Sequence, residues 1–564
     1  MKVRRLVSNK RVLSLVLTAV MATGMITGCQ NSVYTESNRT LSEAEAKKEL
    51  SSLLTKVDVS TNKKPTLDIY SEDVSEADTL ADIDTFPIVV QGNGQINIEI
   101  AAATELSADA PDDFLKVAAE RFNKSGATVD GKSVSVSVRK ITSGEVVTYI
   151  TQGGYRPEVF IPSNEAWGLM LDASGFKTDK IEERLAGNTA GILIKKDAYD
   201  SFIEKYGEVT VKTVLEGANS GDITFAYTNP YTSSTGLNVL SAMLYAFDSS
   251  DPLSDTATKE LLDYQKTSPP VAYTTAVLRN QAAKGIINAM VMEKQAYTNT
   301  PELKNYVYTP VGIRHDHPVY TFDWVDNDQK EAAKLFVDFC LTPEIQKIAT
   351  DKGFNQDDDY VGQDTGMTGA DYIAAQKVWK QNKNGGRPII AVFVADVSGS
   401  MDGEPINSLK ESLIGSSTYI SSDHYIGLVS YSDNVSIDLP IAQFDATQRA
   451  YFSGEVKKLN PGGRTATYDA VLVAANMLEE YAEQIPDAKL MMFVLTDGEQ
   501  NKGYSLDRIT DVVAGLQVPI YTIAYNYNDV SELEKLSNIN EAAQIKANTD
   551  DVINQLRNLF NVNL

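Results

Sequence analysis

The chain has 564 residues, more than one ordinary domain holds, so we expect several folded units. Apolar residues make up 43% of the chain and charged residues 23%, as in folded soluble proteins. The net charge of −25 argues against binding nucleic acid or anionic lipid through a basic surface. Two cysteines cannot build a disulfide scaffold, and three histidines leave little material for zinc sites.

The first 28 residues combine a basic start with an apolar run at 12–28 that ends in Ile26-Thr27-Gly28-Cys29. This order is typical of a secretory signal peptide at 1–28, whereas a transmembrane anchor would need a longer apolar run. The ending resembles the bacterial lipobox. The resemblance implies that Cys29 becomes the first mature residue and carries lipid, which would hold the protein on the outer side of the cell membrane.

Residues 29–86 are polar and rich in Ser, Thr and Asp. A helix is expected from about Thr40 to Leu54, because Ser42 and Glu45 have the spacing of a capping box. We interpret the segment as a tether with one short helix. An ordered arm packed on a later domain is the alternative.

Strand-like and helix-like segments alternate through residues 87–360, which predicts an α/β domain with parallel strands. The expected strands are Ile96–Ala103, Val134–Val138, Pro157–Ile161, Gly191–Ile194 and Asp222–Tyr227, and the expected helices are Asp112–Asn123 and one from Gly236.

Residues 361–386 are expected to form a junction, with a helix at Asp371–Asn382 that carries Trp379 on its apolar face. The preceding Asp357-Asp358-Asp359 marks a loop. A calcium loop is the alternative there, although the regular Asp-x-Asp-x-Asp-Gly spacing is missing.

Residues 387–564 alternate more cleanly and predict a doubly wound, Rossmann-like α/β sheet. The expected strands are Pro388–Ala395, Tyr425–Tyr431, Lys489–Leu495, Val518–Ala524 and Ala543–Ala547. The expected helices are Ile406–Ile420, Thr467–Gln484, Leu506–Leu516, Val530–Leu536 and Asp550–Phe560, the last capped by Thr549.

Oxygen-bearing side chains follow three segments of this last region. Asp396, Ser398 and Ser400 follow its first strand, Thr465 precedes a helix, and Asp497 ends another strand. Ligands of open α/β sheets bind at the carboxyl ends of strands, so these oxygens can converge there. An all-oxygen set suits a hard cation, with Mg²⁺ fitting best.

These five residues, in this order, resemble the metal-ion-dependent adhesion site of the von Willebrand factor A (VWA) family. The resemblance implies that Ser398, Ser400 and Thr465 ligate Mg²⁺ (or Mn²⁺ or Ca²⁺), with Asp396 and Asp497 acting directly or through water. A protein partner would offer an Asp or Glu carboxylate to the metal. We expect no enzyme, because hydrolysis needs a base and only Glu499 lies near.

The front region resembles extracellular solute-binding proteins of the type II periplasmic-binding class, which implies two lobes around a cleft. On that pattern the candidate solute ligands are Thr104, Ser143, Ser163, Ser234 and Thr235. Hydroxyls at helix starts bind anions, but they also cap helices, and both readings stand. The expected ligand is a small polar or anionic solute. Because these loops carry no lysine or arginine, a highly charged anion would have to rely on helix dipoles.

Two further features draw structural interpretations. His315-Asp316-His317 places two imidazoles on one side of an extended segment, and we favour a surface or turn role over a two-histidine metal site. Cys340 lies in an amphipathic helical run and is expected to be a buried, inert thiol.

Taken together, the sequence predicts a membrane-anchored surface lipoprotein whose VWA site binds an extracellular or envelope protein. The front domain would present this site or tune it. The alternative is a solute-binding or sensing component of a transport system, with the VWA domain as an accessory.

Overall fold

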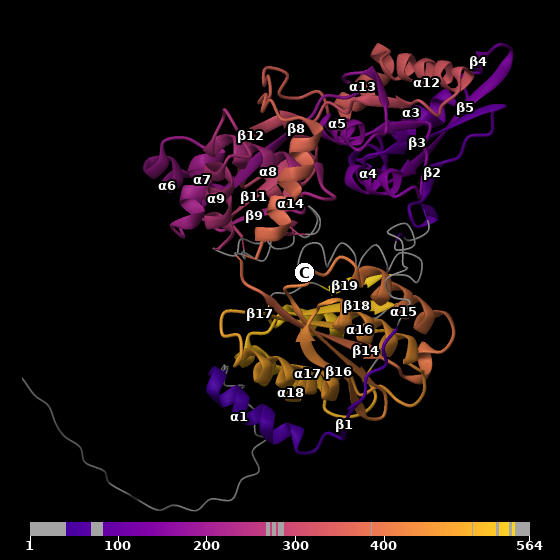
Figure 1. Cartoon of the computed structure of the whole chain (residues 1–564). Coiled ribbons are helices and arrows are strands. Elements are labelled where there is room, and N and C mark those ends of the chain that lie inside the picture. The colour runs from indigo at the N-terminus through magenta and orange to yellow at the C-terminus, as the bar shows by residue number, and fades with distance from the viewer. Residues whose placement is uncertain are drawn as a thin grey trace, which may run out of the picture. The chain divides into compact units, whose positions relative to one another are not determined.

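A computed structural model of the chain gives the fold (Figure 1). It describes residues 41–68, 80, 83–266, 271–272, 278–279, 282, 287–384, 386–498, 500–525 and 530–540, together with the backbone of 544–547. The predicted signal peptide, Cys29, Glu499, Thr549 and the helix predicted at 550–560 lie outside these residues.

The C-terminal domain is built on a sheet with the strand order β1-β16-β15-β14-β17-β18-β19. Pairing from β15 through β19 is parallel, whereas β16 runs antiparallel to β15. The strands are β1 Val59–Thr61, β14 Ile389–Asp396, β15 Tyr425–Tyr431, β16 Val435–Gln443, β17 Lys489–Thr496, β18 Ile520–Tyr525 and β19 Gln544–Ala547. The helical segments are α1 Glu43–Leu54, η4 Gly399–Met401, α15 Glu404–Ser417, α16 Ala446–Lys458, α17 Thr467–Ala482, α18 Leu506–Leu516 and α19 Ser531–Asn538.

Helices cover both faces of this sheet, as a doubly wound fold requires. Every residue of β14 is buried. Ile390, Val392 and Val394 pack into the core that contains α17 and α18, while the alternate positions pack into the core that contains α15 and α16. Because the strand has no solvent-facing side, its sequence is a continuous apolar run. The predicted strands are found within two residues, but β16 and α16 were not predicted.

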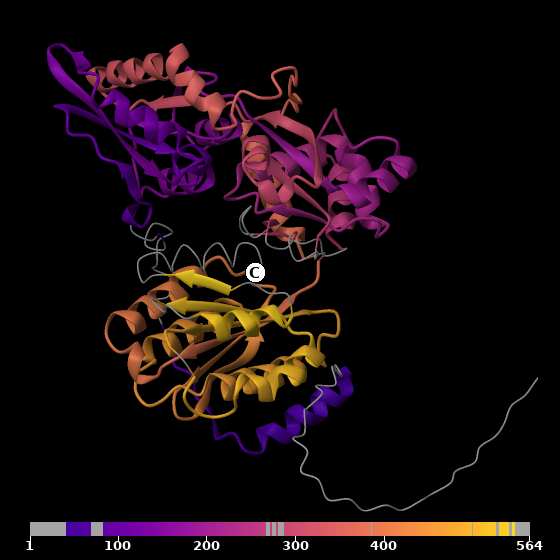
Figure 2. The same cartoon turned by 180° about the vertical axis from the view of Figure 1, so that it is seen from behind.

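The prediction of a loose tether is wrong for residues 41–68, which form an ordered arm on the C-terminal domain. The capping box of Ser42 and Glu45 starts α1 as expected. One face of α1, formed by Ala46, Leu50 and Leu53, is buried in the same core as α17 and α18. Figure 2 shows the indigo helix α1 lying along these two helices from behind. The arm is ordered because these apolar side chains lie on one face of the helix.

The arm continues past α1 into the sheet. Strand β1 pairs in parallel with β16 at the edge of the sheet. Further along, Asp68 accepts hydrogen bonds from Ser453 (2.7 Å) and Lys457 (2.6 Å) on α16. The arm therefore contributes both a helix and an edge strand to the C-terminal domain.

The front domain has two lobes, each with its own sheet. The first sheet has the order β2-β5-β3-β6-β13-β7, with β4 beside β5, and the second has the order β10-β9-β11-β8-β12. The first lobe contains η2 Ile83–Thr85, β2 Ile88–Val90, β3 Ile96–Ala102, α2 Thr104–Ser107, α3 Phe114–Phe122, β4 Thr128–Val129, β5 Lys132–Lys140, α4 Ser143–Thr151, β6 Val159–Ile161, α5 Ala166–Ala173, β7 Thr178–Glu182, β13 Val319–Phe322, α12 Asn327–Cys340 and α13 Pro343–Asp351. The second contains β8 Thr189–Lys195, α6 Lys196–Tyr206, α7 Val211–Asn219, β9 Phe225–Thr228, α8 Ser234–Phe247, α9 Asp255–Gln265, β10 Val271–Ala272, β11 Ala289–Glu293, α11 Lys294–Thr298, η3 Pro301–Leu303 and β12 Tyr306–Arg314.

The expectation of parallel strands holds for only part of each lobe. Strand β3 pairs in parallel with β5 and β6, and β9 pairs in parallel with β10 and β11. Strand β8 is antiparallel to both β11 and β12, and β13 is antiparallel to β6 and β7. The antiparallel strands flank the two points at which the chain crosses between the lobes, at 183–188 and 315–318.

The predicted junction helix belongs to the front domain. Helix α14, Gly369–Asn382, packs on α5, α8 and α9. Trp379 is fully buried in the same apolar core and donates a hydrogen bond to the Tyr227 hydroxyl (2.9 Å). Cys340 is buried as expected, and burial raises the pKa of its thiol.

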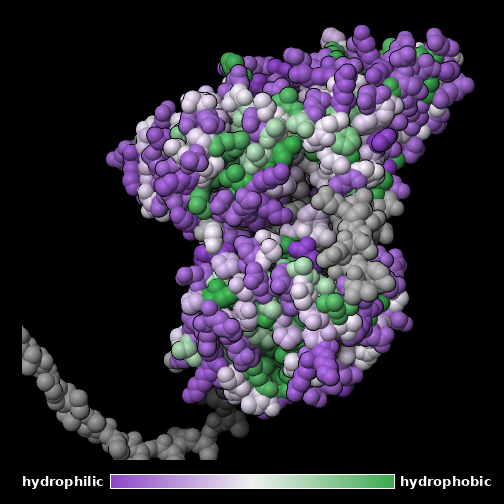
Figure 3. All heavy atoms as spheres, viewed as in Figure 1, coloured by the Kyte–Doolittle hydropathy of each residue, from purple (hydrophilic) through white to green (hydrophobic). Residues whose placement is uncertain are grey.

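Hydrophilic residues cover most of the face seen in Figure 3, with apolar residues in scattered patches. Within the part of the chain that the structure describes, no helix has the length and apolar character needed to cross a bilayer.

Candidate functional site

The predicted metal ligands lie at the carboxyl edge of the C-terminal sheet. Strands β14 and β17 are parallel neighbours, and Ala395 pairs with Leu495, so Asp396 and Asp497 emerge side by side. The Ser398 hydroxyl lies 3.1 Å from that of Ser400, which donates to Asp497 Oδ1 at 2.7 Å. The structure therefore brings four of the five predicted residues into one cluster of oxygens.

Thr465, the fifth residue, is held on an adjoining loop. The Gly399 amide donates to the Gly463 carbonyl (3.0 Å), and the Gly462 amide donates to the Val397 carbonyl (2.8 Å). These two bonds bind the loop before Thr465 to the Asp396–Ser400 turn. Asn501 then fixes Thr465 itself, since its Oδ1 accepts a hydrogen bond from the Thr465 amide (2.9 Å).

Supporting residues that the sequence analysis missed orient the carboxylates. Asp396 Oδ1 accepts from the Ser398 amide (2.7 Å) and Oδ2 accepts from the Thr496 hydroxyl (2.5 Å). Thr496 stands directly before Asp497 in the chain, so its place at the strand end could have identified it.

The electrostatics of the cluster fit a bound cation. Burial raises the pKa of Asp396 to about 6, although hydrogen bonds from Thr496 and Ser398 act to lower it. Burial also raises the pKa of Asp497, more than the hydrogen bond from Ser400 lowers it. No described lysine, arginine or histidine forms an ion pair with either carboxylate. A divalent cation would supply the missing positive charge, and hydroxyl and carboxylate oxygens are the ligands that Mg²⁺ prefers.

A second constellation lies between the lobes of the front domain and contains four of the five predicted solute ligands. Trp167 Nε1 donates to the Ser234 hydroxyl (2.8 Å), which donates to the Ser143 hydroxyl (3.2 Å). Ser143 in turn accepts from the Ser163 amide (3.2 Å). The fourth, Thr235, donates to Glu293 (3.4 Å). Thr104 begins α2 but takes no part in this network.

Helix capping falls to neighbouring residues rather than to the predicted ligands. The Ser233 side chain accepts from the Gly236 amide at the start of α8, and the Thr142 side chain caps α4. The hydroxyls of Ser143, Ser234 and Thr235 instead bond within the network, and all three residues are buried. Capping therefore does not account for these three residues, and the ligand reading stays a hypothesis.

The prediction of a surface role for His315 and His317 is wrong, because both imidazoles are fully buried. His315 Nδ1 lies 2.8 Å from Glu293 of the second lobe, and His317 Nε2 lies 3.2 Å from Glu105 of the first. Their polar character suggested exposure, but two carboxylates distant in sequence satisfy them inside the protein.

His317 and the two glutamates shift one another's pKa values. Burial raises the pKa of Glu105, but the hydrogen bond and charge of His317 outweigh it, so the net shift is downward. Burial lowers the pKa of His317, but Glu105 outweighs that and raises it. The two therefore form a buried ion pair. Burial, together with the negative charge of Glu105, raises the pKa of Glu293.

The histidine and aspartate alternatives for metal binding gain no support. Among the described residues, no three His, Cys, Asp or Glu side chains gather in a metal-binding group. In the Asp357–Asp359 run, Asp357 pairs with Lys294 (3.1 Å) and Asp358 pairs with Arg184. Their carboxylates are thus engaged in ion pairs between segments of the front domain.

Comparison with known proteins assigns both domains. A family model described as "Bacterial extracellular solute-binding protein" matches residues 104–355, and one described as "von Willebrand factor type A domain" matches residues 391–561. The chain therefore combines an extracellular solute-binding domain with a C-terminal VWA domain, in agreement with the α/β folds described above.

Among curated relatives, inter-alpha-trypsin inhibitor heavy chain H1 of Sus scrofa is 25% identical over 198 residues, which covers 32% of this chain and 21% of the relative. The chain thus spans about a fifth of the length of that relative. Among solved structures, iron-bound HitA from Pseudomonas aeruginosa is 15% identical and covers 52% of this chain and 99% of HitA, with a TM-score of 0.37. A von Willebrand factor type A protein from Catenulispora acidiphila is 17% identical and covers 31% of this chain and 42% of that protein, with a TM-score of 0.29.

Proposed function

We propose that this is an extracytoplasmic, lipid-anchored protein whose VWA domain binds a protein partner in a divalent-cation-dependent manner. The observation that carries the proposal is the cluster of Asp396, Ser398, Ser400 and Asp497 oxygens at the carboxyl edge of the sheet. Thr465 on the adjoining loop completes the set.

The ligand set explains why a partner would be needed. Mg²⁺, or Mn²⁺ or Ca²⁺ in its place, would act as a Lewis acid that accepts one more oxygen ligand when bound. If only the hydroxyls of Ser398, Ser400 and Thr465 bind the cation directly, and Asp396 and Asp497 act through water, the cation has no charged direct ligand. An Asp or Glu carboxylate of a partner is then the favoured further ligand. Ser398 and Ser400 would hold the cation, and Thr496 would keep the Asp396 carboxylate oriented.

Binding is favoured over catalysis by the composition of the site. Among the described residues, no histidine or cysteine is hydrogen-bonded to the cluster, and its hydroxyls and carboxylates are the oxygen ligands that a cation needs. The two matching family models describe a solute-binding protein and a von Willebrand factor type A domain. The extracellular family of the front domain supports a location outside the cytoplasm. Attachment to the membrane through lipid on Cys29 rests on the sequence pattern that precedes it.

Partner capture tests this function. Intact cell envelopes would be crosslinked to wild-type protein and to Asp396→Ala, each with Mg²⁺ and with a chelator. We expect wild-type protein to capture a partner when Mg²⁺ is present. We expect neither chelated wild type nor Asp396→Ala to capture that partner. Ser421→Ala, an exposed serine in the same domain, is the matched control and should behave as wild type. A partner that Asp396→Ala and chelated wild type still capture equally well would refute the proposal.

The second candidate is solute binding by the front domain, as part of transport or sensing. The Ser143–Ser234 contact joins α4 of the first lobe to α8 of the second, as a ligand-responsive cleft requires. The network includes two carboxylates but no lysine or arginine, which favours an uncharged polar or cationic solute over an oxyanion. A thermal-shift screen of oxyanions, sugars, peptides and amines against wild type and Ser234→Ala would decide. No shift with any class would count against this function.

A further inference from the structure

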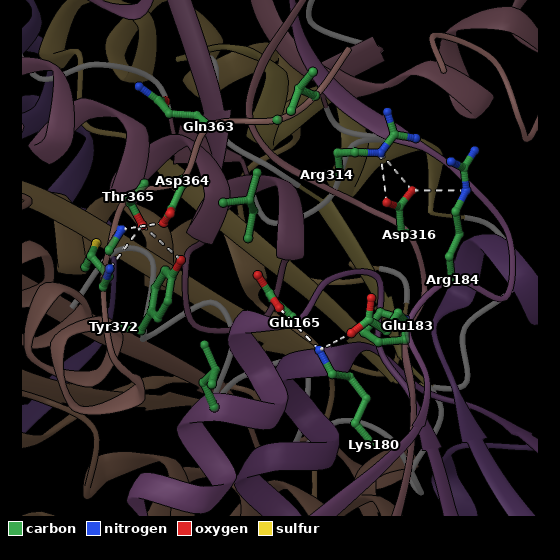
Figure 4. A pocket seen from close by; sticks show the side chains of 17 residues that line it. Glu165, Lys180, Glu183, Arg184, Arg314, Asp316, Gln363, Asp364, Thr365 and Tyr372 are labelled. Atoms are coloured by element: carbon green, nitrogen blue, oxygen red, sulfur yellow. Dashed lines mark hydrogen bonds and ion pairs between the residues drawn. The ribbon is translucent and has the colours of Figure 1, made fainter. Parts of the chain in front are cut away.

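The front domain contains a cavity of about 490 Å³ that is separate from the space between the lobes (Figure 4). Its walls come from both crossings between the lobes and from residues 361–367, the segment before α14. The second crossing divides the two sites. Asp316 lines the cavity, whereas its neighbours His315 and His317 contact Glu293 and Glu105, and none of these four residues lines it.

The segment 361–367 and the adjoining Tyr360 are fixed against the end of β12, so this wall of the cavity is preformed. The Gln363 amide and the Tyr360 hydroxyl both donate to the Gly312 carbonyl, at 2.8 and 2.6 Å. Arg314 Nη1 donates to the Tyr360 carbonyl at 2.6 Å. At Gly362, a Cβ atom would lie 3.0 Å from Arg314 Cγ, which shows how closely the two segments pack.

One wall of the cavity has its charges already satisfied. Arg314 Nε donates to both oxygens of Asp316, at 3.0 and 2.8 Å. Arg184 lies 3.6 Å from the same carboxylate and also pairs with Asp358. Figure 4 shows this chain of ion pairs at one side of the cavity. It gives the wall a fixed shape and leaves ligand recognition to other residues.

Beside this group lie three charged residues with unused hydrogen-bonding capacity, as Figure 4 shows. Lys180 Nζ lies 3.6 Å from Glu165 and 3.7 Å from Glu183, so it is attracted to both carboxylates but is too far from either for a direct hydrogen bond. A ligand carboxylate can accept from Lys180, and a ligand ammonium can donate to Glu165 and Glu183. Lys180 thus matches the negative charge of a zwitterion, and Glu165 and Glu183 match its positive charge.

Apolar residues form part of the remaining lining. Leu169 and Val361 are 38% and 90% exposed, whereas Ile313, Pro318 and Met367 are buried. These side chains can cover an apolar group of a ligand. The polar part of the remaining lining consists of Gln363, Asp364, Thr365 and Tyr372. A volume of about 490 Å³ falls in the range of small-molecule sites.

We propose that this cavity binds an α-amino acid with an apolar side chain, its carboxylate on Lys180 and its ammonium between Glu165 and Glu183. Because Lys180 belongs to the first lobe and Ile313 and Arg314 to the second, the bound ligand bridges both lobes across their connection. If the amino acid binds one arrangement of the two lobes more tightly than the other, its binding changes the affinity for a solute held between the lobes. By linkage, that solute changes the affinity for the amino acid by the same factor. The site is independent of the VWA cation site, so loss of one leaves the other testable.

Isothermal titration of L-leucine into the full mature chain tests the proposal. We expect one site, affinity weakened at least tenfold by Lys180→Gln, and affinity unchanged by Lys212→Gln, an exposed lysine outside the cavity. L-leucinamide and N-acetyl-L-leucine each lack one of the two charges, and each should bind at least tenfold more weakly. A free amino acid and the N-terminus of a peptide both offer an ammonium next to an apolar side chain, and L-leucylglycine distinguishes them. Binding as tight as that of L-leucine would identify a peptide N-terminus, and weaker binding would identify a free amino acid.

Three outcomes would overturn the proposal. The first is no binding of any apolar amino acid at about 10 mM. The second is binding that Lys180→Gln leaves intact. The third is binding that falls with Glu293→Gln but not with Lys180→Gln, which would place the amino acid in the cleft instead. Thermal unfolding of each variant confirms that it is folded.

Discussion

Replacing Leu50 by alanine tests whether the N-terminal arm is part of the C-terminal domain. Leu50 is 2% exposed and packs with Ala46 and Leu53 in the core shared with α17 and α18. Removing a buried leucine side chain costs about 2.7–5 kcal/mol, from lost burial and from the cavity that remains. Because α1 lies at the edge of the domain and can shift to fill the space, we expect the lower part of this range, about 3 kcal/mol.

Scanning calorimetry of the mature chain measures this cost. For a domain of this size, about 3 kcal/mol corresponds to a fall in Tm of about 6–12 °C. Only the transition of the VWA domain should move, since the front domain has its own cores. The control is Lys48→Ala, at an exposed position of the same helix, which should change stability by less than about 0.5 kcal/mol. If Leu50→Ala also stays within about 0.5 kcal/mol, residues 41–68 act as a tether and the reasoning is wrong.

Three further predictions follow from contacts elsewhere. Gly454→Ala should lower the urea midpoint by the equivalent of about 1–3 kcal/mol, because a Cβ there would lie 2.0 Å from the Thr66 carbonyl of the arm; an unchanged midpoint would contradict that contact. His317→Gln should destabilise the protein most between pH 4.5 and 6.5, where the Glu105–His317 ion pair stabilises the folded state fully. The stabilisation by charged Glu105 is lost as pH falls through its lowered pKa. The stabilisation by charged His317 is lost as pH rises through its raised pKa. A stability gap independent of pH, measured by urea unfolding, would exclude the ion pair. Arg464 is exposed, pairs with Asp433 and stands next to Thr465 in the chain. Replacing it by glutamate should leave Mg²⁺ affinity within about threefold, but should slow association with an acidic partner about tenfold at low salt, because a positive charge near the site becomes negative. Surface plasmon resonance measures this association rate.

The cluster of oxygens at the edge of the C-terminal sheet could be predicted because its information is local. Each ligand stands at a strand end or helix start, and parallel strands bring such ends to one edge of the sheet. The apolar run of β14 and the Thr496-Asp497 pair after β17 fix two of these ends without knowledge of the tertiary structure. By contrast, β16 includes Pro440, and a proline within a short run counts against a strand. The alternation of apolar and polar residues around it was the signal that could have identified this strand.

What the sequence could not reveal depends on partners distant in the chain. The pattern of Ala46, Leu50 and Leu53 was present in the arm, but the surface that covers it comes from helices more than 400 residues later. Likewise, His315 and His317 are buried only because Glu293 and Glu105 are brought to them from separate lobes. In both cases a polar composition suggested exposure, and tertiary contacts decided otherwise.

Calorimetric titration of Mg²⁺ tests the central claim most directly. Wild-type protein should bind one Mg²⁺ in the VWA domain, and Asp396→Ala and Ser400→Ala should each weaken that binding at least tenfold, since both remove oxygens from the cluster. Ser421→Ala should bind as wild type does. Equal Mg²⁺ binding by wild type and Asp396→Ala, with both proteins folded, would contradict the account.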